Sequence, residues 1–240
     1  MNKFMLLSMK RTGSNHLLNS LQIASKRKMV WFDAQPNTWK EFNLPFSKNI
    51  WDYNSTWCLD ELFDQYSGCK INWDEPMFYS IIDELLEYPI QKILLHRENI
   101  WEKVISEELA IQTNHWVAPI GRHRVYKEGH KFDAIDVDIV KQKIDDIRDK
   151  MEYFLNFIDD DFIVYSYEDL YSRNNYTDKH RENFKNLLSK LDIKVDEKTF
   201  NSIIGDLMCK EKCYKTDKTY NYIENISELK ELQLKKFMKI

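Results

Sequence analysis

The first twenty or so residues of the chain are predicted to form a buried strand, a polar turn and a helix, and this order constrains the fold more than any other feature of the chain. Residues 3–9 are mainly apolar, residues 10–15 are polar with one glycine, and apolar residues recur at helical spacing after His16. Such a turn directs backbone N–H groups and the positive end of a helix dipole toward one point. It therefore predicts a site for a phosphate or sulfate group. The cations and hydroxyls around that point are Lys10, Arg11, Thr12 and Ser14.

Strands and helices continue to alternate along the chain. Strands are predicted at 29–32, 91–95 and 162–165, and helices from Asp74 to Pro89 and at 100–109, 137–157, 181–191 and 196–208. This alternation predicts an α/β fold with a parallel sheet that is covered on both faces. Ligands of such sheets bind beyond the carboxyl ends of the strands. We therefore expect one cleft to collect side chains from three turns, namely Lys10, Arg11, Ser14, Asp33 and Arg97.

Two segments fit this alternation poorly. Residues 34–70 are rich in aromatic side chains without a clear period, so we expect loops with short helices there, on the acceptor side of the cleft. A loop layer that packs its own aromatics fits the same pattern. The tail at residues 210–240 is polar and then helical from about Ser227. We find no internal repeat and no clear linker. One domain over residues 1–240 is expected, although the length also allows two small domains.

Composition excludes several classes of protein. The net charge of −4 argues against a general nucleic-acid binder, although a local basic pocket remains compatible with it. The chain has only 5 glycines, and none of them completes a GxGxxG or GxxxxGK[ST] motif. No stretch is long and apolar enough for a membrane span, and no signal peptide is visible, so a cytoplasmic protein is expected. The cysteines lack metal-site spacing and are expected to be reduced thiols: Cys58, Cys69, Cys209 and Cys213.

Five segments together resemble one protein family. The turn 10–15 resembles the 5′-phosphosulfate loop of bacterial sulfotransferases, which commonly reads Arg-Thr-Gly-Ser. Residues 97–106 resemble the 3′-phosphate motif of that family, an arginine at a strand end and a serine in the next helix. Residues 110–116 look like the Ala-x-Gln-Thr-x-x-Trp of its trehalose-sulfotransferase-like branch. Residues 167–170 are similar to its Tyr-Glu-Asp-Leu, and residues 222–229 to its C-terminal Ile-x-Asn-x-x-Glu-Leu.

The resemblance implies a three-layer α/β/α domain with a P-loop NTPase-like parallel sheet. It also implies 3′-phosphoadenosine 5′-phosphosulfate (PAPS) as the sulfuryl donor, no metal, and a hydroxyl of a carbohydrate or small metabolite as the acceptor. Arg97 and Ser106 would hold the 3′-phosphate, although a surface ion pair with a nearby acid is the alternative for Arg97. Lys10 and Arg11 would neutralise the leaving group during catalysis. The 5′-phosphosulfate would lie on Lys10, Arg11, Thr12, Gly13, Ser14 and Asn15.

The acceptor hydroxyl needs a general base. The family often places a glutamate just after the second strand, whereas this chain has Asp33 there and Glu41 eight residues later. Asp33 is our first candidate and Glu41 the second, with a helix cap or loop acid as the alternative for Asp33. Because the expected glutamate is absent, a non-catalytic relative that binds a nucleotide or a partner is an alternative to the enzyme, as is a P-loop-like small-molecule kinase. The sequence makes no prediction of oligomeric state.

Overall fold

The computed structural model describes residues 2–32, 55–75, 82–113, 131–171, 177–205 and 220–232. Contacts between Cα atoms divide the chain into two compact units. The first unit consists of Met1–His96, Ile158–Tyr165 and Phe184–Asn201. The second consists of Arg97–Phe157, Ser166–Asn183 and Ser202–Ile240. The single domain expected over residues 1–240 stays a prediction.

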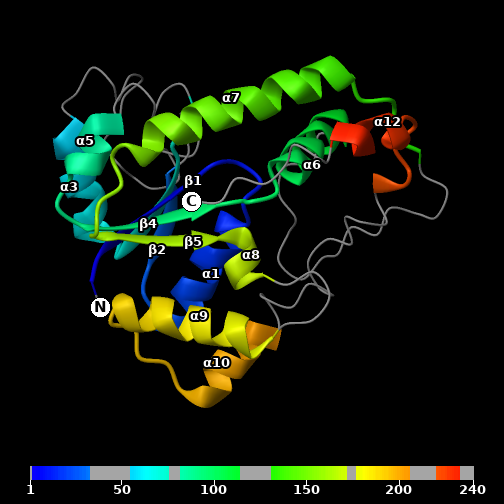
Figure 1. Ribbon diagram of the computed structural model, residues 1–240. Coiled ribbons are helices and arrows are strands. Elements are labelled where there is room, and N and C mark those ends of the chain that lie inside the picture. The colour runs from blue at the N-terminus through cyan, green and yellow to red at the C-terminus, as the bar shows by residue number, and fades with distance from the viewer. Residues whose placement is uncertain are drawn as a thin grey trace. The chain divides into compact units, whose positions relative to one another are not determined.

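A five-stranded parallel sheet forms the centre of the first unit, with the strand order β2-β3-β1-β4-β5 (Figure 1). All five residues of β1 are buried, because β3 and β4 pair with its two edges and helices cover the sheet. The predicted α/β fold with a parallel sheet is confirmed. The strands are β1 (Phe4–Ser8), β2 (Met29–Phe32), β3 (Gly68–Asn72), β4 (Gln91–His96) and β5 (Phe162–Ser166).

Among the strands of the described residues, β3 is the one that the sequence does not predict. It lies at the end of the aromatic-rich segment, where Gly-Cys-Lys-Ile-Asn contains no apolar run. The segment is nevertheless buried, because β1 and β2 pair with its two edges. Gly68 lets the ring of Phe4 lie against the strand, since an added Cβ would be 2.5 Å from Phe4 Cζ. The expectation of loops and short helices over residues 34–70 is therefore wrong for residues 68–70, and β3 brings Lys70 and Asn72 beside β1.

The helices of the first unit include α1 (Ser14–Ser25), which packs against β1, β2 and β3 (Figure 1). Its apolar face buries Leu17, Leu18 and Leu21, which is the face that the helical spacing predicts. Asp74 and Glu75 lie in a turn after β3, and not in the first turn of a helix as predicted. The other helices that contribute to this unit are α3 (Ser55–Gln65), α5 (Ile82–Glu87), α9 (Asp178–Lys190) and α10 (Glu197–Ile203).

In the second unit, two long helices pack against each other: α6 (Ile100–Thr113) and α7 (Val137–Leu155). The Asp136 carboxylate caps α7 by accepting from the backbone N–H groups of residues 138 and 139. The shorter helices of this unit are α8 (Tyr167–Leu170) and α12 (Ile226–Glu231). No helix within the described ranges is long and apolar enough to cross a membrane.

Hydrogen bonds between side chains and backbone hold residues 220–232 against the rest of the second unit. The amide of Asn225 donates to the carbonyl of Ile135 at 2.8 Å and accepts from its N–H at 2.9 Å. Next to this pair, Phe132 and Ile223 form a parallel β-bridge. The indole N–H of Trp101 donates to the carbonyl of Leu229 at 2.7 Å. The Ile-x-Asn-x-x-Glu-Leu segment therefore has a structural role in this unit.

Candidate anion-binding site

The turn between β1 and α1 has an unusual backbone. Arg11 and Gly13 have φ angles of 65° and 78°, in the left-handed region. A glycine adopts this conformation without the clash of a Cβ, whereas an arginine is strained there. The hydroxyl of Thr12 is buried and donates to the carbonyl of Met9 at 2.8 Å, so it braces the turn. The two left-handed residues redirect the chain from β1 into α1.

The amino end of α1 is suited to an anion. Gly13 is the N-cap residue and has no side chain that could accept a hydrogen bond from the first turn. Its carbonyl accepts from the N–H groups of His16 at 3.0 Å and Leu17 at 3.2 Å. The N–H groups of Ser14 and Asn15 precede these and have no acceptor within a regular helix. The dipole of the helix adds partial positive charge at this end.

A buried lysine reaches this helix end from the neighbouring strand. Lys70 lies in the middle of β3 with only 8% of its surface exposed, and its Nζ donates to Asn15 Oδ1 at 2.9 Å. An ammonium group is rarely buried without a polar partner. Lys70 was not among the predicted site residues, because residues 34–70 were expected to form loops with short helices. No local pattern in Gly-Cys-Lys-Ile-Asn marks this lysine as part of a central strand.

Lys10 takes part in a polar group that links the ends of β1 and β3. Its Nζ lies 3.3 Å from Glu75 Oε1, and the same oxygen accepts from Asn72 Nδ2 at 3.3 Å. Ser8 and Asn72 are paired in register, and the Ser8 hydroxyl donates to Asn72 Oδ1 at 3.4 Å. These contacts place a carboxylate beside the turn. The sequence analysis missed it because Glu75 was assigned to the start of a helix.

His16 lies in the first turn of α1 and is partly buried. Burial lowers the pKa of its imidazole below the ordinary value of 6.5. The ring is therefore neutral at neutral pH, and the fixed positive charge around the turn comes from Lys10, Arg11 and Lys70.

Arg97 forms an ion pair with the buried carboxylate of Glu102. Its Nη2 lies 2.7 Å from Glu102 Oε2, and both side chains are buried. The guanidinium also lies over the ring of Tyr167, 4.7 Å from the ring centroid. The alternative predicted for Arg97 was an ion pair at the surface, whereas this ion pair is buried. A phosphate at Arg97 would share the guanidinium with Glu102, whose carboxylate the arginine already neutralises.

The amino end of α6 is capped by two residues. Asn99 Oδ1 accepts from the N–H of Glu102 at 3.1 Å, so Asn99 caps the first turn of the helix. The carboxylate of Glu168 accepts from the N–H groups of Glu98 at 3.0 Å and Asn99 at 3.3 Å. Burial raises the pKa of Glu168 above its usual value, against the effects of these donors and of Arg97. Ser106 is buried farther along the same helix.

The structure thus brings the 5′-loop residues 10–15 together in one turn of the first unit, whereas Arg97 and Ser106 belong to the second unit. The single cleft expected from the sequence stays a prediction. Asp33 and Glu41 lie outside the described residues. Within the described ranges, no group of three or more His, Cys, Asp or Glu side chains is arranged to hold a metal ion.

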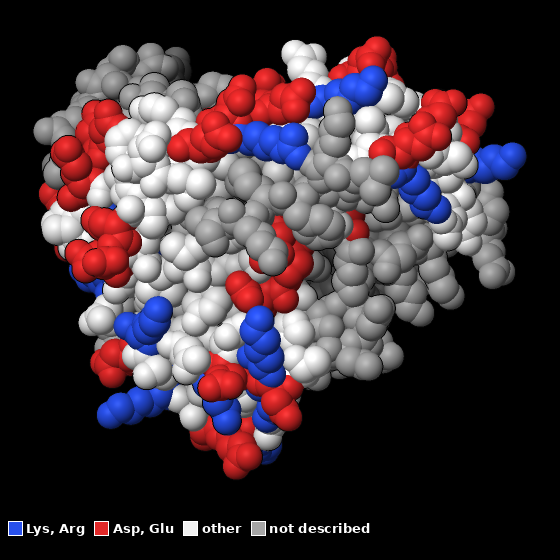
Figure 2. Space-filling view, in the orientation of Figure 1, with Lys and Arg blue, Asp and Glu red and all other residues white. Residues whose placement is uncertain are grey.

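Acidic and basic side chains alternate over the face shown in Figure 2.

Comparisons of the sequence with protein-family models and with curated proteins found no match. The resemblance to sulfotransferases therefore depends on the sequence motifs alone.

Proposed function

We propose that the protein is a PAPS-dependent sulfotransferase that acts on a hydroxyl of a carbohydrate or small metabolite. The observation that carries this proposal is the left-handed turn between β1 and α1, where Lys10, Arg11 and Lys70 surround a helix end with a glycine cap. A cationic turn of this kind suits a doubly charged phosphosulfate. The order of the motifs along the chain supports the same assignment, and with it a three-layer, P-loop-like architecture and a cytoplasmic location.

The chemistry assigned to the turn is electrostatic. In sulfuryl transfer, as in phosphoryl transfer, negative charge grows on the oxygen that bridges to the 5′-phosphate. Lys10 and Arg11 would neutralise this charge, while the N–H groups of residues 12–15 would hold the nonbridging oxygens. Removal of one preorganised hydrogen-bond donor of this kind typically costs ~10²–10³ in rate in enzymes.

The 3′-phosphate is assigned to Arg97 and Ser106. The guanidinium of an arginine can donate two parallel hydrogen bonds to one phosphate. The ion pair with Glu102 keeps the Arg97 guanidinium in one orientation, but the negative charge of Glu102 offsets part of its attraction for a phosphate. Donor affinity is therefore expected to depend more on the 5′-loop than on Arg97.

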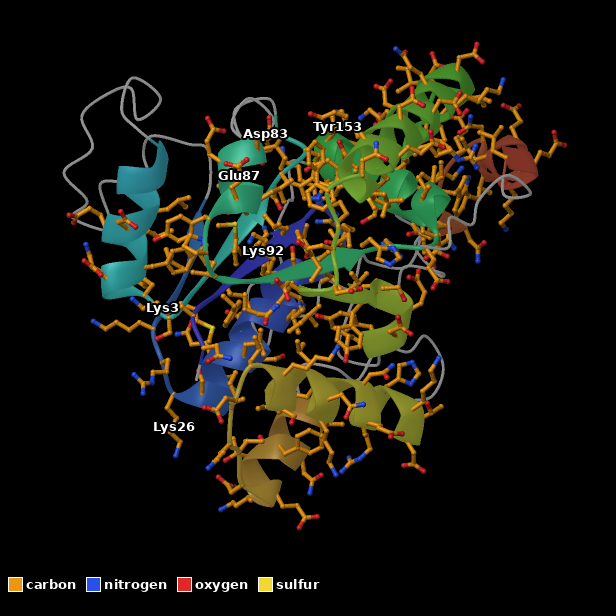
Figure 3. All side chains as sticks on the ribbon, turned by 60° about the vertical axis from the view of Figure 1, so that its left-hand side comes forward. Lys3, Lys26, Asp83, Glu87, Lys92 and Tyr153 are labelled. Carbon is orange, nitrogen blue, oxygen red and sulfur yellow. The ribbon has the colours of Figure 1, made fainter. Side chains whose placement is uncertain are left out.

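Binding of 3′-phosphoadenosine 5′-phosphate, the product nucleotide, tests this proposal. We expect saturable heat in isothermal titration with this nucleotide, and none with ATP and Mg²⁺. Lys70→Met should weaken binding by ~10–100-fold, because it removes a charged donor worth about 1.5–3 kcal/mol. The matched control is Lys3→Met, an exposed lysine at the amino end of β1, far along the strand from the turn (Figure 3).

The outcomes separate the alternatives. Binding of ATP and Mg²⁺ without binding of the product nucleotide would favour a small-molecule kinase and reject the sulfotransferase. Binding of the product nucleotide without sulfuryl transfer from ³⁵S-labelled PAPS to a panel of sugars and phenols would favour a non-catalytic relative. Equal affinity in the Lys70→Met variant and the wild type would remove Lys70 from the site.

A further inference from the structure

The carboxylate of Glu75 lies at the carboxyl end of β3, beside the cationic turn. Its Oε1 is 3.3 Å from Lys10 Nζ. The turn that carries Glu75 is fixed to both strands, because the N–H of Trp73 donates to the carbonyl of Ser8 at 3.1 Å and the N–H of Glu75 to that of Asn72 at 3.2 Å. The position of this carboxylate is therefore set by β1 and β3.

The orientation of the Glu75 carboxylate is fixed by side chains. Oε1 accepts from Asn72 and faces Lys10, and Asn72 in turn accepts from Ser8. This is a chain of polar groups in which an acid is oriented by a second residue and that residue by a third. The Glu75 side chain is 14% exposed, compared with 41% for Lys10. The carboxylate is thus shielded from most of the solvent and remains accessible to a small group.

We propose that Glu75 is the general base that accepts the proton of the acceptor hydroxyl. This inference rests on the sulfotransferase proposal. As the acceptor oxygen forms its bond to sulfur, its proton passes to the Glu75 carboxylate. The bond between sulfur and the bridging oxygen breaks, and the electron pair stays on the 5′-phosphate oxygen, where Lys10 neutralises it. The products are the sulfate ester, 3′-phosphoadenosine 5′-phosphate and a protonated Glu75.

The Glu75–Lys10 pair contains the two charged groups that sulfuryl transfer needs, a carboxylate and an ammonium group. A general base must lie within reach of the proton and a cation must lie near the leaving oxygen, and in-line attack puts the two reacting oxygens on opposite sides of sulfur. The Glu75–Lys10 pair places a base and a cation at the same end of two adjacent strands. The alternative is that Glu75 only positions Lys10, and the experiment separates the two roles.

The test compares two acceptors that differ in acidity. An alcohol such as trehalose must lose its proton during transfer, whereas 4-nitrophenol is ionised in mildly alkaline buffer and needs no base. For Glu75→Gln we expect a loss of ~10²–10⁴ in kcat/KM with trehalose and a change of less than ~10-fold with 4-nitrophenolate. The matched control is Glu87→Gln, an exposed acid on α5 that should keep wild-type rates with both acceptors (Figure 3).

Each result decides one of the two claims. An equal loss with both acceptors would overturn the general-base role and show that Glu75 positions Lys10. Unchanged rates with both acceptors would overturn it as well, and loss in Asp33→Asn or Glu41→Gln would then identify the base. Affinity for 3′-phosphoadenosine 5′-phosphate, measured for each variant, shows whether the site is intact. If the wild type transfers sulfate to neither class of acceptor, the sulfotransferase proposal itself fails.

Discussion

Replacement of Glu168 tests how the amino end of α6 is stabilised. Its half-buried carboxylate accepts two hydrogen bonds, from the N–H groups of Glu98 and Asn99, at 3.0 Å and 3.3 Å. A buried donor without an acceptor costs about 1–3 kcal/mol. Glu168→Ala leaves two such donors, so we expect the free energy of unfolding to fall by about 2–4 kcal/mol, since water can reach part of the site.

Glu168→Gln has a different expected result. The glutamine keeps one oxygen for one N–H donor, and it removes the cost of holding a charge away from water. These effects oppose each other, so the unfolding free energy at neutral pH should change by less than about 1 kcal/mol. The unfolding free energy of Glu168→Gln should therefore be close to that of the wild type, and that of Glu168→Ala should be well below both.

The dependence on pH gives a second, independent measurement. The pKa of Glu168 is raised above its usual value of 4.5, because burial opposes the charged form. Between the unfolded and folded pKa values, the folded protein holds more protons than the unfolded chain. The stability that this group contributes is therefore present below the unfolded pKa and is lost as pH rises through the folded pKa. The difference in unfolding free energy, wild type minus Glu168→Gln, should decrease as pH rises from 4.5 toward neutrality.

Urea unfolding followed by circular dichroism measures these differences at several pH values. Glu152→Ala, an exposed acid on α7, is the control and should stay within about 0.5 kcal/mol of the wild type. The reasoning would be refuted if Glu168→Ala were as stable as the wild type. A difference from Glu168→Gln that grows with pH would show instead that the hydrogen bonds outweigh the cost of burial.

Two further substitutions test other features. Gly13→Ala should lower the unfolding free energy by about 1–2 kcal/mol and weaken binding of 3′-phosphoadenosine 5′-phosphate, because φ of 78° disfavours a Cβ; calorimetry measures both, and Gly205→Ala, with open space for its Cβ, is the control. Equal unfolding free energies of Gly13→Ala and Gly205→Ala would contradict the expected strain of a Cβ in the turn between β1 and α1. Asn225→Ala should lower the unfolding free energy by about 1–3 kcal/mol through loss of both hydrogen bonds to Ile135, whereas the exposed Asn221→Ala should have little effect. Equal chemical-denaturation midpoints would show that this pair contributes nothing.

Local patterns predicted much of the fold. β1 and α1 were readable because an apolar run and a helical spacing follow each other directly, and the turn between them carries the only glycine among residues 1–30. The cap of α6 by Asn99 was readable for the same reason, since its partner Glu102 is three residues away. Features that depend on neighbours in the chain are the ones that periodicity and capping rules detect.

The part that could not be predicted depends on pairing between distant strands. β3 has no apolar run, and its burial comes from the strands on either side. The contacts of Lys70 with Asn15 and of Ser8 with Asn72 follow from the register of β3 against β1, which no local pattern fixes. The same holds for Glu168, whose two donors lie on a turn far earlier in the chain.

The strand order has a consequence for synthesis on the ribosome. β4 is complete at His96, but its neighbour β5 begins at Phe162, after α6 and α7 have emerged. During that interval one edge of β4 has no strand beside it, and an unpaired edge of apolar residues can pair with another chain. The chain also passes repeatedly between the two compact units, so no single truncation isolates one unit from the other. Nascent chains that stall between α6 and β5 are therefore expected to be the species most prone to aggregate.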